Sequence, residues 1–185
     1  MNNDLYKNKY RIQTTRLSSW DYSNSGYYFV TICTKNKKCI LGKIIEEKVT
    51  LSKIGKVVKA CWLQIPIHFN NVKLDEFIIM PNHIHGIIII NKPDNVETRY
   101  IASLREDNIT KKFGPLEPNS LQTIIHSFKS AVTRWCRKNG YRNFAWQSRF
   151  YDHIIRNETS LMKIQEYILN NPLKWELDKE NPDNF

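Results

Sequence analysis

The sequence predicts an α+β fold in which an antiparallel sheet is covered by helices. Strand-like and helix-like apolar patterns alternate along the chain, and two strand-like runs follow each other with only a tight turn between them. The 185 residues are enough for one ordinary domain with a sizeable core, whereas two independent domains would each be small. We therefore expect a single domain over residues 1–185.

The first strand and the first helix follow from composition and period. Residues 27–34, YYFVTICT, are aromatic and β-branched and come after the turn residue Gly26, which is typical of a strand. In residues 51–66, LSKIGKVVKACWLQIP, apolar side chains recur at offsets of 3, 4, 7, 8 and 11 from Ile54. This spacing predicts an amphipathic helix that stops at Pro66.

Two more strands follow. The second is expected over residues 72–80, VKLDEFIIM, and the third over residues 83–90, HIHGIIII. Pro81 and Asn82 lie between them and are the kind of pair that turns a chain sharply. The apolar run after the two histidines has no polar break, which indicates a strand buried in the sheet.

The last part of the chain contributes two helices and a strand. Ser120 is a candidate N-cap for the helix LQTIIHSFKSAVTRWCRKNG, whose apolar positions have a strong helical period and which ends at Gly140. Residues 144–157, FAWQSRFYDHIIRN, are expected to form a fourth strand. Asn157 can then cap a last helix, ETSLMKIQEYILNNPLKW, which should end near Pro172.

This order of elements corresponds to a split β-α-β arrangement with an additional helix. The expected architecture is a ferredoxin-like or RRM-like sandwich, with an antiparallel sheet, helices on one face and a C-terminal helix. We expect the other face of the sheet to be free for a ligand.

Three segments lie outside these elements. Residues 1–25 form a basic N-terminal arm, and residues 176–185 form a polar C-terminal tail. Residues 91–119 are charged, contain three prolines and show no sustained period. We expect them to be a long insertion.

The charge of the chain points to a polyanionic partner. There are 28 Lys and Arg against 18 Asp and Glu, which gives a formal net charge of +10 at pH 7. Such an excess attracts nucleic acid. A membrane partner is not expected, because no stretch approaches the roughly 20 consecutive apolar residues that span a bilayer.

The start of the chain and its cysteines indicate a reducing compartment. The N-terminus lacks the apolar region of a signal peptide, which predicts a cytoplasmic, nucleoid-associated protein. The cysteines show no CxxC spacing, and we expect structural or idle thiols rather than disulfides or zinc ligands. They are Cys33, Cys39, Cys61 and Cys136.

Two histidines at the start of the third strand are candidate metal ligands. His83 and His85 are two residues apart, so their side chains point to the same face of the sheet and can converge on one ion. A histidine at this position is also often only a polar residue at a sheet edge. A metal site therefore needs a third ligand.

The last helix offers that ligand together with a nucleophile. Tyr167 and Asn171 are four residues apart, about 40° around the helix axis, and both lie on the shoulder of the apolar stripe. Without other evidence, the sequence favours a simpler interpretation, a half-buried helix tyrosine and an asparagine that precedes a helix-ending proline. Because the residue before Pro172 is biased away from helical geometry, the reach of Asn171 depends on how the helix ends.

Five stretches of the chain resemble one known family, in the expected order. They are WDYSNSGYYFVTICTKNKKCILGKI, FIIMPNHIHGIIII, SLQTIIHSFKSAVTRW, WQSRFYDHIIRN and IQEYILNNPLKW. Together they are similar to the single-tyrosine HUH transposases of the IS200/IS605-like group, and most closely to the branch of REP-associated tyrosine transposases. The resemblance covers most of the chain.

This resemblance implies roles for particular residues. In that family the paired histidines bind a divalent metal and a tyrosine on a later helix cleaves single-stranded DNA, and these roles fall on His83, His85 and Tyr167. Asn171 matches the polar residue that completes the metal site, a position filled by glutamine in the IS200/IS605 enzymes. Two nitrogens and an amide oxygen suit Mg²⁺ or Mn²⁺.

The resemblance also implies a substrate and a reaction. The tyrosine attack leaves a 5′-phosphotyrosine and a free 3′-hydroxyl, and the substrate is single-stranded or hairpin DNA. The working form is a monomer or a homodimer. Basic and polar residues are candidate DNA contacts, and they are Arg11, Arg16, Lys37, Lys38, Lys129, Arg134, Arg137, Lys138, Arg149 and His153.

Other readings of the sequence stay open. Tyr151 is a rival nucleophile, although Ile155, four residues later, supplies no metal ligand. A nucleic-acid-binding regulator without enzymatic activity would use the sheet and the basic helix alone. A phosphoesterase that activates water would use the metal but not the tyrosine.

Overall fold

The computed structural model describes residues 17, 19–91, 117–178 and 180–184. Its main sheet has four strands in the order β4-β5-β1-β6, and every neighbouring pair is antiparallel. The strands are β1 (Gly26–Cys33), β4 (Val72–Ile79), β5 (His83–Ile90) and β6 (Tyr151–Ile155). The central pair, β1 and β5, is in register along its full length.

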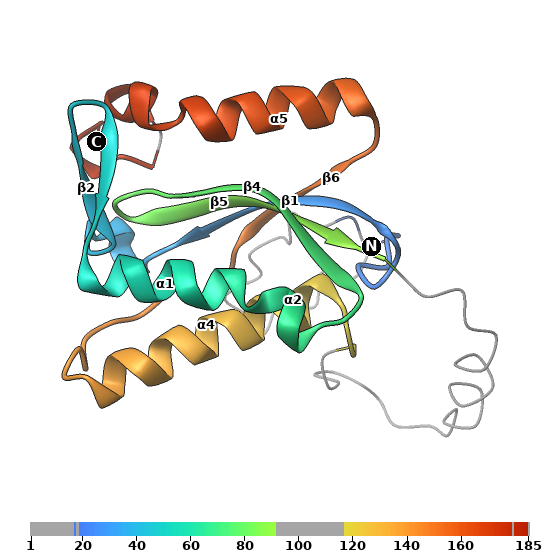
Figure 1. Ribbon diagram of the computed structural model, residues 1–185, viewed down its shortest axis with the longest axis horizontal. Helices are drawn as coiled ribbons and strands as arrows, with labels where there is room; N and C mark the ends of the chain where they lie inside the picture. The colour runs from blue at the N-terminus through green and yellow to red at the C-terminus, as the bar shows by residue number, and fades with distance from the viewer. Residues whose placement is uncertain (1–16, 18, 92–116, 179, 185) are drawn as a thin grey trace, which may run out of the picture.

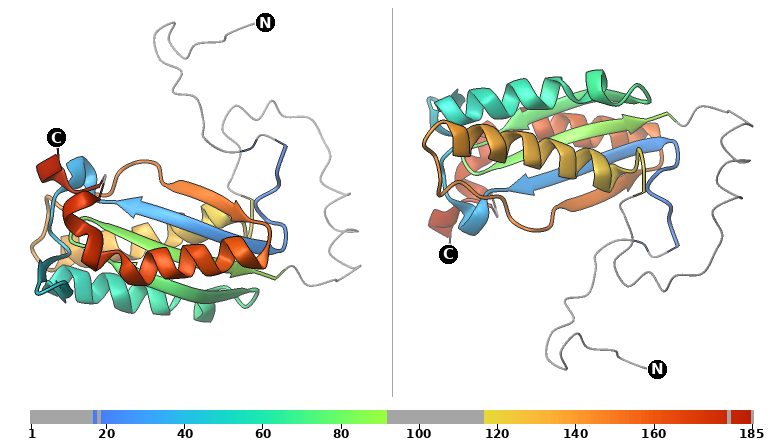
Figure 2. Two further views of the ribbon diagram at one scale, coloured as in Figure 1. Left: turned by 90° about the horizontal axis from the view of Figure 1, so that it is seen from above. Right: turned by 90° about the horizontal axis from the view of Figure 1, so that it is seen from below.

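Helices lie on both faces of this sheet (Figure 1). On one face are α1 (Lys53–Leu63), the short α2 (Ile65–His68) and α4 (Leu121–Lys138). On the other face is α5 (Glu158–Asn170), which Figure 2 shows lying over the strands and running roughly along them. The expected α+β fold with an antiparallel sheet and a C-terminal helix is confirmed.

The expectation of a free second face is wrong. Leu161, Ile164 and Ile168 on α5 pack against a small apolar cluster that includes Phe29 and Ile87 from the sheet. An apolar stripe on a helix must be buried against another element, and for α5 that element is the second face of the sheet. A ligand could therefore reach this face of the sheet only beside α5, and not across the whole face.

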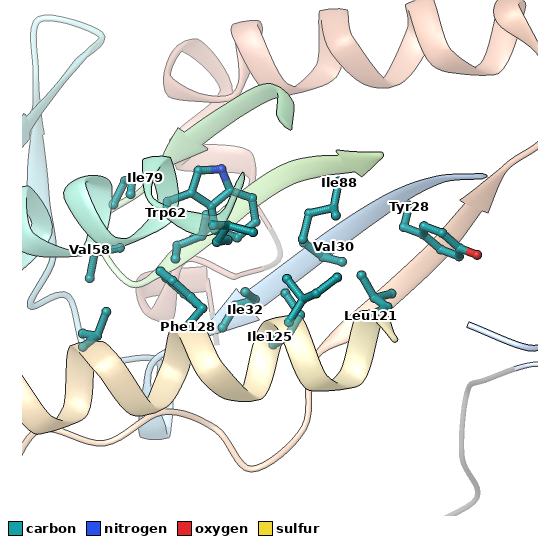
Figure 3. Packing of buried hydrophobic residues seen from close by; sticks show 14 of the residues in the cluster. Tyr28, Val30, Ile32, Val58, Trp62, Ile79, Ile88, Leu121, Ile125 and Phe128 are labelled. Carbon is teal, nitrogen blue, oxygen red and sulfur yellow. The ribbon is translucent and has the colours of Figure 1, made fainter. Parts of the chain in front are cut away.

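The main core fills the space between the sheet and the pair α1 and α4 (Figure 3). Trp62 of α1 meets Phe128 of α4 edge to face, with ring centroids 5.3 Å apart. The same indole crosses β5 so closely that a Cβ added at Gly86 would lie 2.5 Å from it. Only glycine therefore fits at position 86, where α1 crosses β5. Burial of a neighbouring apolar side chain such as Ile88 stabilises the fold by about 1.5–3 kcal/mol.

Side-chain caps fix where the helices begin. Ser120 accepts a hydrogen bond from the Thr123 amide, and Asn157 accepts one from the Ser160 amide. Both predicted caps are therefore confirmed. The expected stop at Pro66 is right for α1, although the proline also occupies the first turn of α2, where its missing N–H has no cost.

Two local predictions differ from the structure. A hairpin of β2 (Gly42–Ile45) and β3 (Lys48–Leu51) was not expected, because its strands are short, largely exposed and without a continuous apolar face. The fourth strand is shorter than residues 144–157. Phe144 and Trp146 pack with the core aromatics instead of continuing the strand.

The C-terminal segment folds back onto the body of the protein. A 3₁₀ helix, η2 (Pro172–Leu177), follows α5 and contacts the β2–β3 hairpin, and a second, η3 (Pro182–Asn184), lies near the end. Arg11 and Arg16 in the N-terminal arm, and residues 92–116 of the predicted insertion, lie outside the described residues. Among the described helices, none combines the length and the apolar character needed to cross a bilayer.

Candidate active site

The two histidines lie together at the start of β5. Both side chains are buried, and their ring centroids are 4.4 Å apart. They point to the α5 face of the sheet, because residues i and i+2 of a strand share a face. The structure thus places His83 and His85 where both rings can approach one ion.

Each histidine is held through its Nδ1 atom. His83 Nδ1 lies 2.8 Å from Asn82 Oδ1, and His85 Nδ1 lies 2.9 Å from the Thr31 hydroxyl. Contacts of this kind orient a ring and leave Nε2 to face the ligand. His83 Nε2 faces a carboxylate oxygen of Asp178 at 3.9 Å.

Tyr167 projects from α5 toward the same point. Its hydroxyl lies 3.2 Å from His85 Nε2, and its ring meets Phe29 edge to face. The side chain is 38% exposed, so it is reachable from solvent. The structure therefore joins the predicted nucleophile to one of the predicted ligands, although the two are 82 residues apart in sequence.

The surroundings of Tyr167 disfavour its ionised form. Burial raises the pKa of the phenol, the charge of Asp178 raises it further, a hydrogen bond with Asn171 lowers it, and Glu180 raises it again. The net shift is upward from the ordinary value near 10. Tyr167 is consequently a neutral phenol at physiological pH.

Asn171 is buried beside the tyrosine. Its backbone is helical, with φ −59° and ψ −39°, even though Pro172 follows. The predicted bias against helical geometry does not prevent this, because the proline begins the tighter turn η2. The Oδ1 atom of Asn171 is buried and accepts no hydrogen bond from the described residues.

Asp178 is a further candidate ligand that the sequence did not indicate. Ligand atoms of His83, His85 and Asp178 all lie within 4.8 Å of one another. The carboxylate is buried, and its Oδ2 atom accepts no hydrogen bond within the described part of the chain. Sequence reasoning assigned this residue to a polar tail, since no periodic pattern follows Pro172 that could place a side chain at the site.

These atoms fit a divalent cation. A buried carboxylate oxygen and a buried amide oxygen without donors cost free energy unless a cation or a donor satisfies them. Two imidazole nitrogens and two such oxygens are a reasonable ligand set for Mg²⁺, Mn²⁺ or a later transition metal. The donor chemistry of His83, His85, Asn171 and Asp178 therefore supports the predicted metal site.

Tyr151, the rival nucleophile, lies outside this cluster. It begins β6, pairs with Thr31 across β1, and is 47% exposed. Its ring meets Phe29 edge to face at 6.4 Å, so Phe29 is packed against both tyrosines. His153 is also exposed on β6, opposite Phe29 in register.

The predicted basic contacts are spread over the molecule. Lys37 and Lys38 lie near the C-terminal segment, where Lys37 forms an ion pair with Glu180 at 3.5 Å. Lys129 donates hydrogen bonds to the carbonyls of Gln147 and Arg149 and so ties α4 to the segment before β6. The remaining α4 cations lie on the helix that covers the face away from Tyr167, and they are Arg134, Arg137 and Lys138.

Comparison with known proteins places this geometry in a family. No family model matches the chain. An uncharacterized protein of Haemophilus influenzae is 42% identical over 167 residues, which cover 90% of this chain and 91% of that protein. The chain belongs to the same family as this protein.

Two further proteins are similar to this chain, one in sequence and one in structure. The "Putative REP-associated tyrosine transposase" of H. influenzae is 26% identical over 163 residues, covering 83% of this chain and 74% of that protein. The structure of a REP-associated tyrosine transposase bound to a REP hairpin matches with a TM-score of 0.59 at 19% identity, covering 89% of this chain and 77% of that one. The chain has the fold of a REP-associated tyrosine transposase. The resemblance predicted from the sequence motifs is confirmed, and the site described above lies within this transposase fold.

Proposed function

We propose that this chain is a metal-dependent transposase that nicks single-stranded DNA and transfers strands through a covalent 5′-phosphotyrosine. The observation that carries the proposal is the Tyr167 hydroxyl, 3.2 Å from His85 Nε2, at the edge of the buried cluster of His83, His85 and Asp178. The transposase fold supports the same class of reaction. A sheet that only bound nucleic acid would need no such cluster.

The cation would be held by the predicted ligands His83, His85 and Asn171, joined by Asp178. When bound, Mg²⁺ or Mn²⁺ would neutralise charge on the non-bridging oxygens of the scissile phosphate. The protein would hold the ion with two imidazole nitrogens, one amide oxygen and one carboxylate oxygen. Phe29 supports this arrangement by packing against the rings of both His85 and Tyr167.

The bonds made and broken follow from an in-line attack. The Tyr167 oxygen bonds to phosphorus as the bond from phosphorus to the 3′-oxygen breaks, and the departing 3′-oxygen takes up a proton. The phenol proton leaves to solvent, which reaches the partly exposed ring. A DNA 3′-hydroxyl can later displace the tyrosine and rejoin strands without ATP, because the phosphoester link is kept.

Hairpin or single-stranded DNA is the proposed substrate. The net charge of +10 favours a nucleic acid, and the similar solved transposase is bound to a REP hairpin. The predicted DNA contacts, including Lys38 and Arg149, remain part of the proposal. Tyr167 and His85 of the same chain meet, which supports a site completed within one monomer.

A gel assay for protein–DNA adducts tests the proposal. Wild-type protein with Mn²⁺ and a hairpin that carries a single-stranded flank should give a covalent adduct, and a chelator should abolish it. Tyr167→Phe should bind the DNA but form no adduct. Cleavage that persists in Tyr167→Phe without an adduct would indicate a water-activating phosphoesterase, and binding without any cleavage or metal dependence would indicate a regulator.

A further inference from the structure

Asn82 is a buried amide that links the metal cluster to two other parts of the chain. It lies in the tight turn between β4 and β5 and is 1% exposed. Its Nδ2 atom donates hydrogen bonds to the backbone carbonyls of Lys37, at 3.0 Å, and Glu180, at 2.6 Å. Carbonyl oxygens only accept, so the reverse orientation of the amide would place three oxygens against one another. The Asn82 side chain therefore has one orientation.

The orientation of the Asn82 amide determines which nitrogen of His83 carries the proton. Asn82 Oδ1 faces His83 Nδ1 at 2.8 Å, and an amide oxygen has no hydrogen to donate. The hydrogen bond therefore requires a proton on Nδ1 of His83. A neutral imidazole carries one N–H, so its lone pair is then on Nε2, the atom that faces Asp178.

His85 provides a contrast within the same cluster. Its Nδ1 partner is the Thr31 hydroxyl, which can donate or accept a hydrogen bond. Thr31 therefore orients the ring but leaves the position of the proton open. Of these two contacts at Nδ1, only the one between Asn82 and His83 dictates a tautomer.

We propose that Asn82 is a positioning residue that locks His83 in the Nδ1–H tautomer and so presents the Nε2 lone pair to the cation. The carbonyls of Lys37 and Glu180 orient the amide, which makes the C-terminal segment a structural support of the metal site. The proposal rests on the proposed function for the identity of the ligand, but the tautomer is a property of the metal-free protein. It adds Asn82 to the residues that determine metal affinity.

Nitrogen NMR of the metal-free, ¹⁵N-histidine-labelled protein tests the tautomer directly. At a pH well above the usual imidazole range, His83 should show a protonated Nδ1 and an unprotonated Nε2. The signal is assigned with His83→Gln. Asn82→Ala removes the acceptor beside Nδ1 and should convert His83 to a mixture of tautomers.

Metal titration supplies the second readout, with Thr31→Val as the matched control. Asn82→Ala should lower Mn²⁺ affinity about 10- to 100-fold in calorimetry. Thr31→Val should leave the His83 tautomer unchanged, because Thr31 contacts His85. A wild-type His83 with its proton on Nε2, or an Asn82→Ala protein with unchanged spectrum and affinity, would overturn the inference. Wild-type protein with the expected tautomer but no Mn²⁺ binding would instead contradict the proposed function and leave the tautomer assignment standing.

Discussion

At the scale of single residues, the decisive contact is between Tyr167 and His85. The hydroxyl occupies the position on Nε2 that a cation would take, since a ring nitrogen has either one lone pair or one hydrogen. A metal ligated by His85 must therefore displace this hydrogen bond. In the proposed mechanism, the Tyr167 hydroxyl and the His85 ring would be in contact before the cation binds and would separate when it does.

Tyr167→Phe should consequently bind Mn²⁺ as tightly as the wild type, or up to about tenfold more tightly. The lost hydrogen bond contributes about 0.5–1.5 kcal/mol to the metal-free state, and the phenyl ring keeps the packing on Phe29. Calorimetric titration of the two proteins measures the difference. Clearly weaker binding by the mutant would mean that the phenol oxygen is itself a ligand.

Asp178→Asn should weaken Mn²⁺ binding at least about tenfold, which corresponds to about 1.4 kcal/mol. The substitution removes the negative charge from the cluster with His83 and His85 but keeps the shape of the side chain. Glu180→Gln is the matched control, because that carboxylate contacts Lys37 and Cys33 instead. Equal affinities for all three proteins would remove Asp178 from the site.

The cysteines should differ sharply in reactivity toward an alkylating agent. Burial raises the pKa of Cys33 to about 12, with a further contribution from the charge of Glu180, and burial raises the pKa of Cys136 to about 11. At mildly alkaline pH these thiols hold almost no thiolate, while Cys39 is exposed. Peptide mass spectrometry over a time course should find Cys39 modified first. Modification of Cys33 at the same rate would contradict the buried position of its sulfur.

At the scale of elements, the packing of α5 on the sheet both stabilises the fold and positions Tyr167. Ile168 is fully buried against Phe29 and Ile87, one residue after Tyr167. Packing of this side chain therefore sets how Tyr167 approaches the histidines. A loosened helix would displace both Tyr167 and Asn171 from the histidines.

Ile168→Ala should lower the free energy of unfolding by about 2–5 kcal/mol and reduce adduct formation as well. Leu169→Ala is the control, since this neighbour is 60% exposed and its truncation should change stability by no more than about 0.5 kcal/mol. Urea unfolding curves and the adduct assay measure the two effects. If Ile168→Ala unfolds like the wild type, α5 is not anchored through this side chain.

The elements that the sequence predicts well are those with a strong period. The β5 strand and α4 have the bounds that alternation, apolar runs and caps indicate, because burial on one defined face leaves a repeating pattern. The β2–β3 hairpin has no such face. It turns through Glu46 and Glu47, both with positive φ, and neither residue type signals that turn.

At the scale of the whole molecule, the site joins segments that no local pattern connects. The four-residue spacing of Tyr167 and Asn171 and the two-residue spacing of His83 and His85 could be read from the sequence, as could the face that each pair shares. Their meeting depends on α5 lying over the second face of the sheet, which the sequence reading left free. Asp178 could not be predicted, because a 3₁₀ turn and the packing of the β2–β3 hairpin place it rather than any repeat.

The most direct test of the proposed chemistry is to identify the residue that carries DNA. Adducts formed with Mn²⁺ are digested with a nuclease and with trypsin, and the modified peptide is sequenced by mass spectrometry. Tryptic cleavage separates the two candidates, since Tyr167 falls in residues 164–174, IQEYILNNPLK, and Tyr151 in residues 150–156, FYDHIIR. We expect the nucleotide on Tyr167. A nucleotide on Tyr151, or cleaved DNA with no modified peptide, would contradict Tyr167 as the nucleophile.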